Sequence, residues 1–259
     1  AAGGTLGILI PPSVVLVIYA ILTEQSIGKL FIAAMVPGIL AALGYMIAIA
    51  ILVRFDPAAG PAGPKASLGH KLRTLLELLP VIIVFVVMMG GMYGGFFTPT
   101  EGAAVGAAST AVIAFVRGGM RLKGLIECLL GTAKISGMIF LILIGADLFN
   151  GFLAITQMPN QAAAAIAGSG FAPMTVLALI LLMYLVLGCV MDSMSMILIT
   201  IPVLFPIVMK LDFGLSPEDT AIWFGILVLI CVEVGLITPP VGLNVFVINS
   251  MAPEVPMSE

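Results

Sequence analysis

The residues of this chain that could do chemistry are oxygen-bearing side chains set inside apolar sequence. Asp192 lies in the short polar segment Met191-Asp192-Ser193-Met194-Ser195, which separates two apolar stretches. Carboxylate and hydroxyl oxygens are the ligands that a hard cation such as Na⁺ prefers. We therefore expect Asp192, Ser193 and Ser195 to bind an ion or a substrate. The alternative is that Asp192 only caps the helix that follows it.

A second set of oxygens lies where two prolines interrupt an apolar segment, Gly235-Leu236-Ile237-Thr238-Pro239-Pro240-Val241-Gly242-Leu243-Asn244. Two prolines remove two N–H donors, so carbonyl groups of the preceding turn are freed. Thr238 and Asn244 add uncharged oxygens, and Gly242 lets a ligand approach the backbone. We expect a binding region that includes Gly235, Thr238, Pro239, Pro240, Gly242 and Asn244.

The same design occurs near the start of the chain, in Gly7-Ile8-Leu9-Ile10-Pro11-Pro12-Ser13. Paired segments that are interrupted by glycine and proline indicate the binding site of a secondary transporter. This predicts that the same binding region includes Gly7, Pro11, Pro12 and Ser13. The alternative is that the polar residues at both breaks only satisfy backbone groups freed within a kink.

Other polar residues in or beside apolar sequence have structural or undecided roles. Thr98-Pro99-Thr100-Glu101 has the spacing of a capping box, so Thr98 and Glu101 are expected to start a helix. Lys134 is expected to extend to the membrane interface. Charged residues inside membrane segments are functional hypotheses, yet the sequence does not decide between a site and a packing role for Asp147, Asn150 or Glu233.

Composition sets the class of protein. The 259 residues are 61% hydrophobic and 9% charged, whereas a soluble domain carries about 25% charged residues. The chain is therefore expected to be a polytopic membrane protein, and its net charge of −3 argues against a nucleic-acid partner. The three cysteines lack metal-ligand spacing, and the one histidine leaves no Ser-His pair. No HExxH or GxSxG motif is present, so we expect no enzyme.

The elements that must position these residues are apolar helices, because a spanning helix needs about 20 apolar residues. The expected helices are 12–22, 30–53, 75–95, 99–116, 135–153, 173–190, 193–209, 219–235 and 241–252. The helices beside the double prolines are too short to cross alone and are expected to be halves of discontinuous helices. The two arms around Asp192 are expected to form a re-entrant hairpin.

Charge and leucine patterns suggest how the helices lie in the membrane. The Pro/Gly-rich loop around 54–73 holds Arg54, Lys65, Lys71 and Arg73, and positive loops face the cytoplasm. A second basic cluster, Arg117, Arg121 and Lys123, is consistent with the same side. Residues 121–130 and 68–79 each place leucines on one helical face, so they are expected to lie in the interface as anchors or as scaffold arms.

Four motifs together resemble the large permease (M) subunit of TRAP (tripartite ATP-independent periplasmic) transporters. They are Gly4 to Ser13, Phe97 to Glu101, the hairpin from Gly188 to Pro206, and Gly235 to Asn244. The resemblance implies an all-α polytopic elevator transporter with inverted repeats, a re-entrant hairpin and discontinuous helices. Residues 1–29 would end the first repeat, 30–133 would form scaffold spans and arm helices, and 134–259 would form the second repeat, with a hairpin near 173–209 and a broken helix over 219–252.

The resemblance also implies a function. The subunit would import organic acids, such as C4-dicarboxylates, sialic acid or similar carboxylates, in symport with Na⁺ across a bacterial or archaeal inner membrane. A periplasmic substrate-binding protein would deliver the substrate, and a small membrane (Q) subunit would assemble with the permease. No cofactor is expected besides Na⁺ as the coupling ion, for which the candidate ligands are Asp192, Ser193, Thr238 and Asn244.

Two alternatives and one expectation about the chain's extent remain. A related elevator-type dicarboxylate/Na⁺ symporter would need no binding protein, and a structural or assembly subunit would carry no ion site. The family subunit has an upstream hairpin rich in Ser and Gly, and this chain begins at Ala1 after it. We therefore expect a C-terminal fragment that does not transport by itself. The sequence does not name the carboxylate carried.

Overall fold

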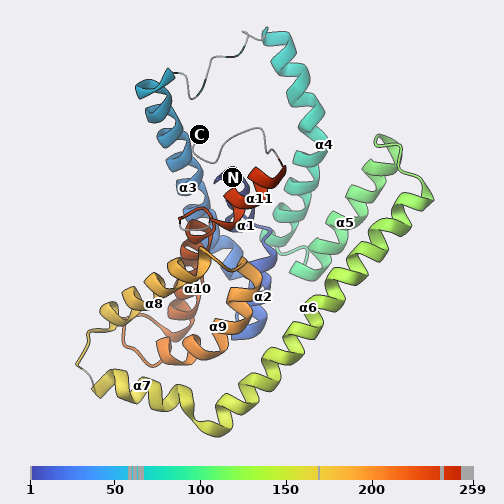
Figure 1. Cartoon of the computed structure of the whole chain (residues 1–259). Coiled ribbons are helices and arrows are strands. Elements are labelled where there is room, and N and C mark those ends of the chain that lie inside the picture. The colour runs from blue at the N-terminus through green and yellow to red at the C-terminus, as the bar shows by residue number, and fades with distance from the viewer. Residues whose placement is uncertain are drawn as a thin grey trace. The chain divides into compact units, whose positions relative to one another are not determined.

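The computed structural model describes residues 2–57, 60, 63, 67–168, 170–239 and 242–251, and every regular element in these ranges is a helix (Figure 1). Five apolar segments have the length and hydropathy of membrane spans: Gly3–Thr23, Ile27–Phe55, Leu68–Tyr93, Pro99–Val116 and Leu122–Thr156. The chain is thus an all-helical, multi-pass membrane protein. In chain order its helices are α1 (Ala2–Leu9), α2 (Val14–Thr23), α3 (Ile27–Phe55), α4 (Leu68–Tyr93), α5 (Pro99–Val116), α6 (Leu122–Thr156), α7 (Met158–Gly168), α8 (Pro173–Gly188), α9 (Ser193–Val208), α10 (Pro217–Gly235) and α11 (Leu243–Met251).

Short polar side chains set where many helices begin. Each such side chain accepts a hydrogen bond from a backbone N–H of the first turn, which would otherwise have no partner. Thr98 and Glu101 form the full capping box at the start of α5. The other N-caps of this kind are Ser13, Ser26, Ser67, Asp192 and Ser216.

The chain packs as two compact units, one of residues 60–141 and one of residues 1–59 with 142–259. In the first, α4 lies against α5 through small residues. A Cβ placed on Gly102 would be 2.8 Å from Met92 Cγ, and one on Gly106 would be 2.7 Å from Met88 Sδ. Glycine at both positions therefore lets the two helices approach closely. The two units are distinguished only by the contacts within them. The expected inverted repeats therefore stay a prediction.

The second unit places α8 against α10 and α2 against α9. Tyr19 of α2 is buried, and its hydroxyl donates to the Ala221 carbonyl of α10 at 2.6 Å. Its ring fills the space over Gly225, where a Cβ would lie 2.4 Å from Tyr19 Cε1. Tyr184 of α8 is also buried and shares a 2.7 Å hydrogen bond with Thr200 of α9. These contacts hold both interrupted segments and the hairpin within one unit.

Some expected boundaries are wrong. The segments 68–79 and 121–130 are not separate helices: each is the first part of a long continuous helix, α4 or α6. No proline separates segment 121–130 from the apolar residues that follow, and a lone Gly131 does not end a helix whose hydrogen bonds continue. The basic loop expected over 54–73 begins within α3 and ends within α4, and its Lys65 lies outside the described residues.

Two further helices were not expected. α1 contains Gly3, Gly4 and Gly7, which lower helix propensity, yet it packs against α3 and α10. α7 follows a turn in which Gln157 has a φ of 54°, in the left-handed region. Gln157 itself is neither glycine nor proline, but Pro159 follows two residues later at the start of α7, and proline commonly marks a helix boundary. The expected boundaries did not use this signal.

Candidate functional site

The polar segment around Asp192 forms the tip of a helical hairpin. α8 ends at Gly188 and α9 begins at Ser193, so residues 189–192 join two helical arms of 16 residues each. The Asp192 carboxylate accepts a hydrogen bond from the Ser195 backbone N–H at 3.0 Å. Asp192 therefore caps α9, as the alternative reading supposed. Its side chain is nevertheless exposed, so capping leaves it accessible to a ligand.

The second double-proline segment separates α10 from α11. α10 ends at Gly235, and Thr238 Oγ1 donates to the Val234 carbonyl at 2.5 Å. Gly242 has a φ of 57°, a left-handed conformation that glycine adopts at little cost. The Asn244 N–H then donates to the Leu236 carbonyl at 3.1 Å, which ties the start of α11 back to the break. Pro240 and Val241 lie outside the described residues.

The hairpin tip touches this break at three places. At the first, the backbones meet, because a Cβ on Gly235 would lie 2.8 Å from Gly188 Cα. At the second, Cys189 Sγ lies 3.4 Å from the Pro239 carbonyl oxygen and donates to it. The third is a side-chain hydrogen bond from α9 to α10, described below. Two polar motifs that are well separated in the sequence thus form one continuous region.

The third contact joins two buried polar side chains. Ser193 Oγ donates to Glu233 Oε1 at 3.1 Å, and the two residues are only 6% and 4% exposed. Glu233 Oε2 is buried and has no hydrogen-bond partner among the described residues. The sequence left Glu233 undecided between the site and a packing surface. The structure turns it toward the hairpin, and no sequence signal could show this, since the sequence of α10 is apolar around its whole circumference.

The first double-proline segment lies in the same compact unit. Ser13 is 2% exposed and caps α2 by accepting from the Leu16 N–H at 3.4 Å. α1 packs against α3 and α10, and α2 packs against α9. Pro11 is buried, whereas Gly7 and Pro12 are exposed, and the Pro11–Pro12 peptide bond is cis. The residues expected at this break are therefore attached to both the hairpin and α10 through their flanking helices.

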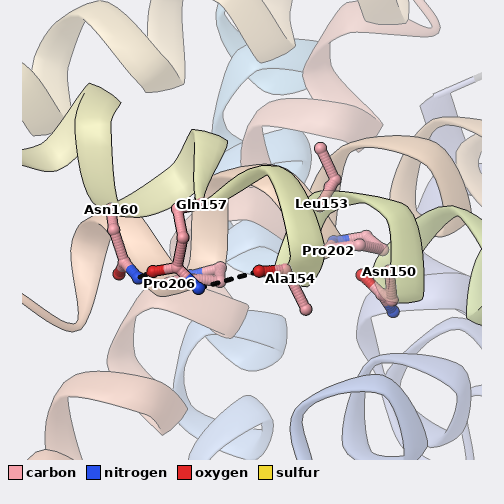
Figure 2. A pocket seen from close by; sticks show the side chains of 7 residues that line it. All are labelled: Asn150, Leu153, Ala154, Gln157, Asn160, Pro202 and Pro206. Carbon is pink, nitrogen blue, oxygen red and sulfur yellow. Dashed lines mark hydrogen bonds between the residues drawn. The ribbon is translucent and has the colours of Figure 1, made fainter.

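A separate cavity of about 240 Å³ lies where α6 turns into α7 beside α9, and Figure 2 shows the residues that line it. Gln157 Nε2 donates to the Ala154 carbonyl at 2.8 Å, and Asn160 Nδ2 donates to Gln157 Oε1. Lys210 in turn donates to Asn160 Oδ1. Asn150 lines this cavity, while Asp147 is exposed on α6. The remaining lining residues are Leu153, Pro202 and Pro206.

The donor set limits how a cation could be held. Within the part of the chain that the structure describes, no three His, Cys, Asp or Glu side chains are grouped as metal ligands. The oxygens near the hairpin tip are instead the exposed Asp192 carboxylate, the buried Glu233 carboxylate, hydroxyl groups and backbone carbonyls. Such a set suits a weakly held monovalent cation better than a transition metal.

Comparison with known proteins identifies the family. A family model described as the DctM component of tripartite ATP-independent periplasmic transporters matches residues 1–259. The C4-dicarboxylate TRAP transporter large permease protein DctM of Pseudomonas aeruginosa is 42% identical over 249 residues, which are 96% of this chain and 56% of that protein. The isethionate TRAP transporter permease protein DctMQ of Oleidesulfovibrio alaskensis is 32% identical over 255 residues, 97% of this chain and 39% of that protein.

The sialic acid TRAP transporter permease protein SiaT of Haemophilus influenzae is 31% identical over 250 residues, 96% of this chain and 39% of that protein. The chain thus spans about half the length of the relatives it matches, or less. All three relatives are named as permease proteins. This confirms the resemblance seen in the motifs and the expectation that the chain is not an enzyme.

Proposed function

Because the chain belongs to the DctM component family of tripartite ATP-independent periplasmic transporters, we propose that it forms part of the large permease of a secondary transporter for organic acids. The observation that carries this proposal is the contact between the hairpin tip and the broken helix α10–α11. Relatives are named for C4-dicarboxylate, isethionate and sialic acid, which are all organic acids. A periplasmic binding protein would deliver the substrate, and a small membrane subunit would assemble with the permease in the inner membrane.

The helix lengths support a re-entrant hairpin. The arms α8 and α9 have 16 residues each, which is about 24 Å of helix. A hydrocarbon core of about 30 Å is longer than either arm. Arms that turn back at Asp192 would bring the polar tip inside the membrane, where the break of α10 supplies freed carbonyls. In an elevator mechanism with inverted repeats, this tip and break would move together.

We further propose that Na⁺ binds at this region. Asp192, Ser193 and Thr238 supply oxygens from two segments that touch, and Asn244 follows on the same break. The orphaned Glu233 oxygen supports the fit of a cation, because a buried carboxylate without a counter-ion is costly. When bound, the cation would supply positive charge that offsets the charge of an anionic substrate. The chain's own residues would hold the two segments together around it.

The proposal is tested by uptake into proteoliposomes that contain the assembled transporter. A panel of carboxylates is offered with and without a Na⁺ gradient and with and without the binding protein. Uptake that needs both is the expected result, and uptake without the binding protein would favour the related elevator symporter instead. Asp192→Ala and Thr238→Ala should each abolish Na⁺-driven uptake at normal expression.

The matched control is Thr132→Ala, because Thr132 is exposed and its hydroxyl only donates to the Cys128 carbonyl within α6. This variant should transport normally. If Asp192→Ala and Thr238→Ala also transport normally, the ion site is not at this region, and a structural or assembly role becomes the better explanation.

A further inference from the structure

Ser193 and Glu233 form a buried hydrogen bond in which the serine hydroxyl is the donor. A serine hydroxyl has one hydrogen to donate and two lone pairs that accept. Ser193 Oγ gives its hydrogen to Glu233 Oε1, so the lone pairs of the oxygen are left pointing elsewhere. An oxygen in this state is ready to coordinate a cation.

Resting on the proposed Na⁺ coupling, we propose that Glu233 is a positioning residue for the coupled cation. It acts through Ser193: the carboxylate holds the hydroxyl hydrogen and thereby fixes Ser193 Oγ as a cation ligand. Groups behind a ligand commonly orient it and increase its basicity, and their loss lowers metal affinity by about 10–100-fold.

The charge environment of Glu233 supports this role. The helices that pack against α10 are α1, α2, α3, α8 and α9, and their basic residues are Lys29 and Arg54. Lys29 is paired with Glu218 at 2.5 Å near the other end of α10, and Arg54 is exposed in the last turn of α3. Among the described residues, no salt bridge includes Glu233. A cation beside Ser193 would supply the missing compensation.

The backbone around the pair keeps its geometry fixed. The Gly188–Gly235 approach and the Cys189–Pro239 contact lie on the same side of the hydrogen bond, before Ser193 in the hairpin and after Glu233 on the broken helix. The hairpin tip therefore cannot slide along α10 without breaking all three contacts. The orientation of Ser193 is thus set by α10, not by the hairpin alone.

The test measures Na⁺ affinity directly in the purified, assembled transporter. The apparent dissociation constant of Na⁺ is read from the Na⁺-dependent rise in thermal unfolding temperature, and the Na⁺ dependence of uptake is measured in parallel. We expect Glu233→Gln to weaken Na⁺ binding about 10–100-fold, with uptake recovering at high Na⁺. Glu218→Gln is the matched control, because Glu218 lies on the same helix but is exposed, and it should leave Na⁺ affinity unchanged.

Variants of Ser193 keep the test decisive if Glu233→Gln does not fold. Ser193→Ala should weaken Na⁺ binding as much as Glu233→Gln, whereas Ser193→Thr, which keeps the hydroxyl, should restore most of it. Wild-type Na⁺ affinity in Glu233→Gln, or in Ser193→Ala, would overturn the proposal for Glu233 alone. A wild-type protein whose unfolding temperature does not respond to Na⁺ would instead overturn the proposed Na⁺ coupling, and this inference with it.

Discussion

Replacing Gly235 by alanine should loosen the hairpin from α10. The added Cβ would lie 2.8 Å from Gly188 Cα, 2.9 Å from the Leu185 carbonyl oxygen and 3.0 Å from the Gly188 carbonyl carbon. All three atoms belong to the backbone of α8, so no side chain can turn away. Overpacking of this kind costs about 1–3 kcal/mol, and the gain from alanine in a helix offsets about 0.5–1 kcal/mol of it.

The net destabilisation of the closed contact is therefore about 0–2.5 kcal/mol, with a midpoint of about 1.3 kcal/mol. Each 1.4 kcal/mol is about a tenfold change in an equilibrium constant, so the open form of the hairpin should be populated about tenfold more. Cys189 reports this opening, because it is 4% exposed in the closed contact. In a background with Cys128→Ser and Cys231→Ser, the rate of Cys189 alkylation by a small maleimide should rise about tenfold in Gly235→Ala.

Gly151→Ala is the control, since no heavy atom lies within 4 Å of a Cβ built there. Gly151 also lies inside a helix of the same unit, so this variant should keep the wild-type alkylation rate and be slightly more stable. Equal alkylation rates in Gly235→Ala and Gly151→Ala would refute the reasoning, because the close approach of Gly188 and Gly235 would then not hold the tip closed.

The remaining predictions concern helix caps and pairs outside the tip. Thr98→Ala removes the cap of α5 and should lower the free energy of unfolding by about 0.5–2 kcal/mol, with the substrate KM of uptake unchanged; a changed KM would argue for a binding role. Tyr19→Phe removes the hydrogen bond to the Ala221 carbonyl and should cost about 0.5–1.5 kcal/mol in the same unfolding assay; no loss would mean that the bond contributes nothing. Lys29→Met breaks an exposed pair with Glu218 and should cost less than about 1 kcal/mol in a double-mutant cycle, so a larger coupling would contradict the exposure of the pair.

The sequence predicted most helices because the apolar runs are long and their first turns carry cap residues such as Thr98 and Asp192. It did not predict the continuity of α4 and α6, since an amphipathic pattern followed directly by an apolar one looks like two helices. The turn at Gln157 was also missed, although Pro159 follows it two residues later and proline commonly marks a helix boundary. Oxygen-bearing residues at the tip and the break could be found from their types, but their mutual contact depends on the packing of α8 against α10.

Glu233 shows why a site cannot be completed from sequence in such a protein. In a helix on the surface of a soluble protein, the polar face shows which side meets solvent. An acidic residue on the opposite, apolar face is then easily recognised as buried. α10 is apolar around its whole circumference, and the position of Glu233 therefore carries no directional signal. The side of α10 on which the carboxylate acts becomes known only from its hydrogen bond with Ser193, which lies 40 residues earlier in the chain.

Contact between the tip and the break also bears on how an ion gradient could be used. A ligand shifts a conformational equilibrium only by the difference in its affinity for the two states. Oxygens that belong to one rigid segment would bind a cation equally well whether the hairpin is closed or open. Oxygens divided between Ser193 on α9 and Thr238 on the break of α10 would bind it better when the contact is closed. The division of the candidate ligands across the Gly188–Gly235 contact is thus what would let Na⁺ binding act on the position of the hairpin.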